Sequence, residues 1–168
     1  MAESGVILRT ATAADAPALA ALYGWHVVHG LGTFDEVPPP AAEMAAKVKG
    51  VLSAGLPFLL AEEGGMLLGY ASASPYRERS GYRFTVEDSV YVAPDQGGRG
   101  VGRALLAAVI ESSAAAGRRR MVAAIGDSGN AASIALHRAL GFEPAGLLRA
   151  VGFKHGRWLD VVFMQREL

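Results

Sequence analysis

Four glycines within six positions, Gly97, Gly98, Gly100 and Gly102, form a loop whose backbone can approach a ligand closely. The loop follows a strand-like run at residues 89–92 and leads directly into an amphipathic helix. The unpaired backbone N–H groups and the positive dipole end of that helix then point toward the ligand. The pattern predicts a phosphate-binding loop, and a plain glycine turn that caps a helix is the alternative.

Two common phosphate-binding patterns do not fit this loop. A dinucleotide fingerprint needs G-x-G-x-x-G, but its sixth position is Arg103 or Leu105, depending on the register. A P-loop needs lysine and then serine or threonine after its last glycine, whereas Arg103 and Ala104 follow Gly102. Because the hydroxyl ligand for Mg²⁺ is missing, the sequence argues against NTP hydrolysis.

The composition excludes further classes of function. The 168 residues are 51% apolar with equal numbers of acidic and basic side chains, which predicts one domain, 1–168, and argues against nucleic acid as a partner. The absence of cysteine excludes disulfides, thiolate zinc sites and a cysteine nucleophile. We expect a cytoplasmic protein without a membrane segment or leader. His26 and His29 lack a third ligand nearby in the sequence, so we expect no metal site.

The spacing of apolar residues and turn signals predicts eleven elements. Their order, β-α-α-β-β-β-α-β-α-β-β, indicates an α/β fold with one central mixed sheet and fits a doubly wound nucleotide fold poorly. The predicted helices are 12–28, 41–53, 103–116 and 130–140. The predicted strands are 6–9, 58–62, 66–74, 85–92, 121–125 and two within 143–168.

The glycine core at residues 98–102 resembles the pyrophosphate loop of the GNAT acetyltransferases, whose pattern is Gln or Arg, two residues, Gly, one residue, Gly or Ala. One departure is that Gly97 stands at the leading position and Gln96 lies one residue early, so a side-chain contact to the pyrophosphate would be lost or shifted. The element order and the later segment 126–133 agree with this family. The resemblance implies a GNAT fold, with a mostly antiparallel central sheet flanked by helices, and acetyl-CoA as the co-substrate.

Three segments resemble one group within that family, the phosphinothricin / methionine sulfoximine N-acetyltransferases: residues 82–92, 133–142 and 151–161. This resemblance implies transfer of acetyl from acetyl-CoA to the α-amine of a small amino acid such as phosphinothricin, methionine sulfoximine or methionine sulfone. It also implies a homodimer whose subunits help to form each other's pocket. Two alternatives stay open: a GNAT enzyme for polyamines or for protein or peptide amino termini, and a non-catalytic acyl-CoA sensor.

The resemblance also implies roles for two side chains. The acceptor ammonium must lose a proton before attack, and Glu87 matches the family's carboxylate position, so Glu87 is the candidate general base, directly or through a water. Strand alternation places Glu87 and Tyr91 on one face and Asp88 on the other, where a structural role is expected. His137 stands where many GNATs have a tyrosine that protonates the leaving thiolate; it is either that acid or a packed, hydrogen-bonded histidine.

Binding residues follow from the same resemblance. The guanidinium groups of arginines suit the carboxylate and the tetrahedral head of the expected amino acids. For Arg79 and Arg83, a solvated role is the alternative. Glu78 stands where relatives usually have proline. The expected substrate-binding residues are Phe34, Glu36, Arg77, Arg79, Arg83 and Glu87. The expected acetyl-CoA-binding residues are Val90, Tyr91, Val92, Gly98, Arg99, Gly100, Val101, Gly102, Arg103 and Asn130, the last of which is also a candidate helix N-cap.

Overall fold

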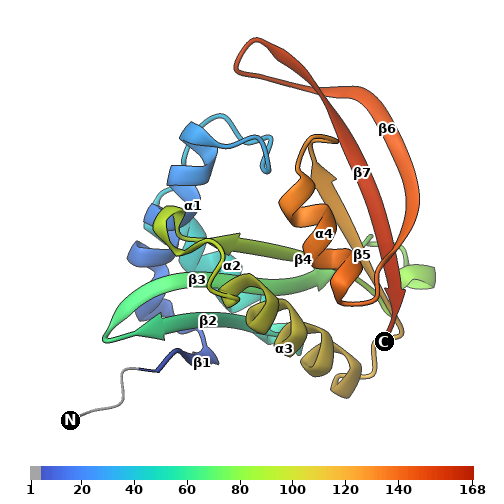
Figure 1. Ribbon diagram of the computed structural model, residues 1–168. Coiled ribbons are helices and arrows are strands. Elements are labelled where there is room, and N and C mark those ends of the chain that lie inside the picture. Colours follow the sequence, from blue (N-terminus) through green and yellow to red (C-terminus); the bar gives the residue numbers. More distant parts are fainter. Residues whose placement is uncertain (1–4) are drawn as a thin grey trace.

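Seven strands form one sheet across residues 5–168, the part of the chain that the computed structural model describes (Figure 1). The sheet order is β1-β2-β3-β4-β5-β7-β6. Within these residues, β4 and β5 pair in parallel, and the other neighbouring strands pair antiparallel. The predicted mixed, mostly antiparallel sheet is thus confirmed. The strands are β1 Ile7–Thr10, β2 Phe58–Glu63, β3 Met66–Pro75, β4 Thr85–Val92, β5 Arg120–Gly126, β6 Glu143–Lys154 and β7 Arg157–Glu167.

The helices agree with the predicted ones except near their ends. They are α1 Ala16–His29, α2 Ala41–Ser53, α3 Val101–Ala115 and α4 Ala131–Ala139, with short 3₁₀ turns η1 Ala13–Asp15, η2 Ser80–Tyr82 and η3 Pro94–Gln96. The helix predicted from residue 12 opens as a 3₁₀ turn, in which the Asp15 carboxylate accepts a hydrogen bond from the Thr12 amide at 2.7 Å. Within residues 5–168, no helix is long and apolar enough to cross a membrane.

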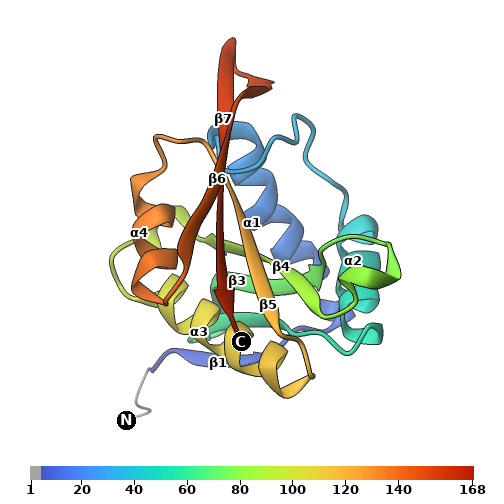
Figure 2. The ribbon, with the colours of Figure 1, turned by 90° about the vertical axis from the view of Figure 1, so that its right-hand side faces the viewer.

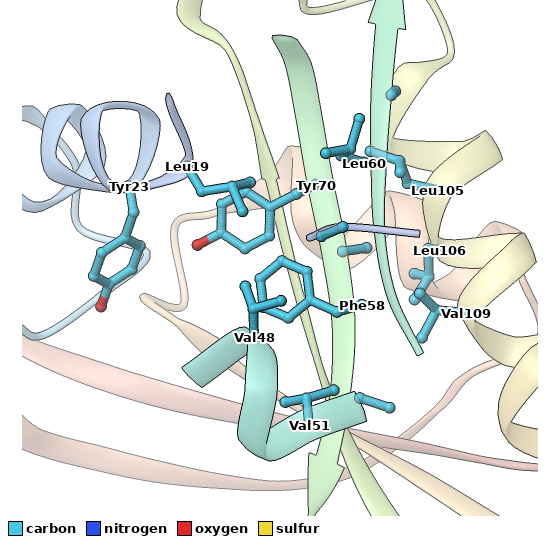
Figure 3. Close-up of a cluster of buried hydrophobic side chains, with 14 of the residues drawn as sticks. Leu19, Tyr23, Val48, Val51, Phe58, Leu60, Tyr70, Leu105, Leu106 and Val109 are labelled. Carbon is cyan, nitrogen blue, oxygen red and sulfur yellow. The ribbon is translucent and has the colours of Figure 1, made fainter. Parts of the chain in front are cut away.

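The hydrophobic core lies on both faces of β2 and β3. Figure 3 shows side chains of α1 and α2 on one side of these strands and side chains of α3 on the other. The β3 segment 68–73 is consequently buried without interruption, as expected for a strand covered on both faces. The labelled core residues are Leu19, Tyr23, Val48, Val51, Phe58, Leu60, Tyr70, Leu105, Leu106 and Val109.

The parallel strands β4 and β5 stay paired only at their first residues. Their register runs from Thr85 opposite Arg120 to Glu87 opposite Val122, after which β4 continues beside β3, and β5 beside β7. Figure 1 shows the two strands diverging beyond this point. The separation leaves one edge of residues 88–92 available to a ligand, next to the start of α3.

Candidate active site

A cavity of about 1020 Å³ lies where β4 and β5 separate. Its walls come from the ends of both strands, the glycine-rich loop with the start of α3, the helix α4, and the loop that follows α1. Twelve of the predicted catalytic and binding residues line it: Phe34, Glu87, Val90, Tyr91, Val92, Gly98, Gly100, Val101, Gly102, Arg103, Asn130 and His137. Asp88, on the opposite face of β4 from Glu87, lines it as well.

The glycine-rich loop has the backbone conformation that its glycines predict. Gly98 and Gly100 have φ values of 77° and 79°, in the left-handed region, and Gly100 is the N-cap of α3. The helix therefore begins two residues earlier than expected, at Val101. Its first N–H groups lie at the wall of the cavity, where they can bind an anion. At Gly102 an added Cβ would lie 3.3 Å from Cγ2 of Val92, so α3 approaches β4 closely.

Alternation along β4 separates its two carboxylates, as predicted. Glu87 lines the cavity and is half-buried. Burial raises the pKa of Glu87, the charge of Asp88 raises it further, and the charge of Arg77 opposes both effects. A carboxylate with a raised pKa is a stronger base once it has lost its proton, which is the property that proton abstraction from an ammonium requires.

Asp88 faces α4, where it contacts His137. Nε2 of His137 lies 2.9 Å from Oδ2 of Asp88, and Nδ1 lies 2.7 Å from the carbonyl oxygen of Ser133. Burial by itself lowers the pKa of His137, but the hydrogen bond to Asp88, its charge and the bond to Ser133 raise the pKa overall. Both ring N–H groups therefore donate to protein oxygens, and this geometry favours the packed, hydrogen-bonded alternative for His137.

Asn130 caps α4, as its place in the sequence predicts. Its Oδ1 accepts a hydrogen bond from the Ser133 amide at 3.2 Å, and its Nδ2 donates to the carbonyl oxygen of Gly126 at 3.1 Å. The side chain thereby joins the end of β5 to the start of α4 at the wall of the cavity.

Comparisons with known proteins identify the family of this chain. The family model described as acetyltransferase (GNAT) family matches residues 25–142. The chain belongs to the GNAT acetyltransferase family. A phosphinothricin N-acetyltransferase of Alcaligenes faecalis is 56% identical over 154 residues, which are 92% of this chain and 78% of that protein. An L-methionine sulfoximine/L-methionine sulfone acetyltransferase of Pseudomonas paraeruginosa is 47% identical over 96% of this chain and 94% of its own.

A solved structure extends the agreement to the co-substrate. The crystal structure of a GNAT superfamily phosphinothricin acetyltransferase from Sinorhizobium meliloti, in complex with AcCoA, superposes with a TM-score of 0.93 at 48% identity. The match covers 97% of this chain and 88% of that one. This GNAT chain is an enzyme that uses acetyl-CoA. The glycine loop and the edge of β4 beyond Glu87 stay the predicted binding sites for the pyrophosphate and the pantetheine arm.

Several residues that the sequence singled out lie away from the cavity of this GNAT enzyme. Arg99 is exposed, and its guanidinium pairs with Gln96 and, at 2.9 Å, with Glu63 of β2. Arg77 lies over the ring of Tyr76, at 5.1 Å from its centroid. Among residues 5–168, the cavity lining includes none of Glu36, Arg77, Arg79, Arg83 and Arg99. Their binding roles stay predictions.

Other wall residues were not singled out as binding residues. His26 of α1 donates from Nε2 to the carbonyl oxygen of Val92 at 2.8 Å, where β4 ends. His26 follows Leu22 by one helical turn, and this spacing is the sequence signal for its place beside the sheet. Arg157 and Val161 of β7 also line the cavity. Both residues lie within the segment 151–161, whose family resemblance was the available signal. Within residues 5–168, no group of three or more metal-binding side chains occurs.

Proposed function

We propose that this enzyme moves acetyl from acetyl-CoA to the α-amine of a small amino acid such as phosphinothricin, methionine sulfoximine or methionine sulfone. The observation that carries the proposal is the half-buried Glu87 in the cavity that also contains the glycine-rich loop. The substrates named for the relatives from Alcaligenes and Pseudomonas support the acceptor class.

In the proposed mechanism, Glu87 takes a proton from the acceptor ammonium, directly or through a water. The free amine then attacks the thioester carbonyl carbon, and a backbone N–H of residues 90–92 stabilises the oxyanion. The C–N bond forms as the C–S bond breaks. The second proton of the adduct nitrogen ends on the sulfur of CoA, which gives the amide and the free thiol.

The hydrogen bonds of His137 support a positioning role over proton donation. Because each of its N–H groups already donates to Asp88 or Ser133, transfer of a proton to the thiolate would break one of these bonds. We therefore assign His137 to holding α4 against β4.

A homodimer is also part of the proposal. Figures 1 and 2 show the β6–β7 hairpin reaching beyond the rest of the molecule. Five of its large apolar side chains are between 46% and 69% exposed, and the centroids of the Phe153 and Trp158 rings lie 5.0 Å apart. A second copy of the chain would remove this surface from water. The exposed residues are Leu147, Leu148, Val151, Phe153 and Trp158.

The test is CoA-thiol release from acetyl-CoA by the purified protein. Phosphinothricin, methionine sulfoximine and methionine sulfone are compared with ordinary amino acids, spermidine and a short peptide. We expect saturable turnover with the first three and a large loss in Glu87→Gln, with the exposed Glu43→Gln of α2 as the matched control. Turnover confined to spermidine or peptide would reject the acceptor class. Tight acetyl-CoA binding without any thiol release would support a sensor instead.

A further inference from the structure

Lys154, the last residue of β6, has a buried ammonium group. The residue is 2% exposed, and its Nζ donates a hydrogen bond to the carbonyl oxygen of Thr33 at 2.8 Å. Burial lowers the pKa of Lys154, while the charges of Asp35 and Glu36 oppose that effect. Burial of a cation costs free energy unless the cation is hydrogen-bonded, and the hydrogen bond to Thr33 meets this requirement for Lys154.

Thr33 is also held from the other side. The Tyr23 hydroxyl and Oγ1 of Thr33 lie 2.7 Å apart, and the Tyr23 hydroxyl also donates to the Asp35 carboxylate. The Asp35 amide donates to the same Oγ1 of Thr33 at 3.2 Å. One residue of the loop between α1 and α2 is therefore tethered both to α1 through Tyr23 and to the β6–β7 hairpin through Lys154.

The next residue, Phe34, is wedged between two strands. A Cβ at Gly126 of β5 would lie 2.6 Å from Cε1 of Phe34, and one at Gly152 of β6 would lie 2.4 Å from Cε2. Both positions therefore need glycine for the ring to lie where it does. Thr33 and Phe34 both line the cavity, so the tethers and the wedge together fix part of its wall.

Glu87 lines the same cavity as Thr33 and Phe34, so an acceptor that this candidate base serves would lie beside this wall. The Tyr23 ring meets the Tyr91 ring edge to face, with centroids 5.1 Å apart, and Tyr91 shares its face of β4 with Glu87. The glycine-rich loop follows Val92, at the opposite end of β4 from Glu87. A shift of the loop would therefore change the space beside the base while leaving the pyrophosphate site in place.

We propose that Lys154 is a positioning residue that holds residues 30–36 as the wall of the acceptor pocket and thereby sets the affinity for the amino acid. In naming the acceptor, the inference rests on the proposed function. The position of the loop itself is a property of the fold and can be measured without turnover.

The experiment compares Lys154→Met, which keeps an unbranched chain but removes the donors, with Lys154→Arg, which restores them. We expect Lys154→Met to raise the KM for the amino acid about tenfold and to leave the KM for acetyl-CoA within about twofold. Lys154→Arg should recover part of the loss. The exposed Lys49→Met of α2 is the control and should change neither KM. Hydrogen exchange at the amides of residues 30–36 should quicken in Lys154→Met alone.

Equal effects on both KM values, or an unchanged amino-acid KM with unchanged exchange, would overturn the proposal. If Lys154→Met does not fold, Tyr23→Phe removes the second tether without leaving a buried charge unpaired. It should show the same selective rise in amino-acid KM, and two unchanged KM values would then count against the proposal. If the wild type acetylates no amino acid, the proposed function fails, and the exchange of residues 30–36 alone decides whether Lys154 holds the loop.

Discussion

Oδ2 of Asp88 accepts a hydrogen bond from Nε2 of His137 over 2.9 Å, with both side chains less than 5% exposed. Asp88 follows Glu87 directly in β4 but faces the other side of the sheet. A single strand thus presents a candidate base to the acceptor on one face and anchors α4 on the other. The anchor lies at the point where β4 leaves β5, so it stabilises the shape of the cavity.

This ion pair makes the free energy of unfolding depend on pH. Because the folded-state pKa of His137 is raised, its stabilising effect is fully present below the unfolded value of about 6.5 and is lost as pH rises through the folded value. Asp88→Asn should cost about 3 kcal/mol at pH 6 and clearly less at pH 9. Urea unfolding at the two pH values measures this, and a cost independent of pH would show that the pair is not charged.

Glu87→Gln should lower kcat by roughly 10²- to 10⁴-fold, because the acceptor loses its proton-abstracting group. In the wild type, kcat should fall at acid pH, with a midpoint above the ordinary carboxyl value of 4.5, since burial raises the pKa of Glu87. The acid limb should be absent from the residual activity of the variant. A pH profile of kcat for both proteins at saturating substrates tests this, and an unchanged limb would assign it to another group.

Gly152→Ala should disturb the wall beside Phe34. The new Cβ would lie 2.4 Å from the ring, which must move, at a cost of about 1–3 kcal/mol in the free energy of unfolding. The amino-acid KM should rise as the ring shifts. Gly146→Ala in the same strand is the matched control, because nothing lies within 4 Å of its added Cβ among the described residues. Equal stability in the two variants would place Phe34 elsewhere.

The parts of the site that depend on local sequence could be predicted. The period-2 alternation of a strand predicts that Glu87 and Asp88 face opposite sides, and the spacing of the glycines predicts the loop before α3. Both features depend only on residues that are neighbours in the sequence. Contacts between distant segments could not be predicted in this way. Lys154 and Thr33 are 121 residues apart, and the tether between them has no local pattern. A strand end with a buried lysine reads in sequence as an ordinary solvated position.

The arginine-bearing loop shows what sequence reasoning leaves open. The family resemblance and the charge of the side chains predict that Arg77, Arg79 and Arg83 bind the acceptor, and all three are exposed on the loop that follows Pro75. The charge of Arg77 lowers the pKa of Glu87, and a direct contact of Arg77 with the acceptor stays a prediction. Side-chain direction in an irregular loop depends on tertiary packing, which composition does not encode.

Gly100→Ala should weaken acetyl-CoA binding selectively. Gly100 has φ 79°, which costs an L-residue about 1–2 kcal/mol, and relief of that strain would turn the first N–H groups of α3 away from the pyrophosphate. The KM for acetyl-CoA should rise about tenfold while the amino-acid KM stays unchanged. Gly97→Ala is the matched control, because its φ of −64° suits any residue. If Gly97→Ala is as harmful as Gly100→Ala, loop size rather than backbone conformation sets the affinity, and the role assigned to the α3 N-terminus is wrong.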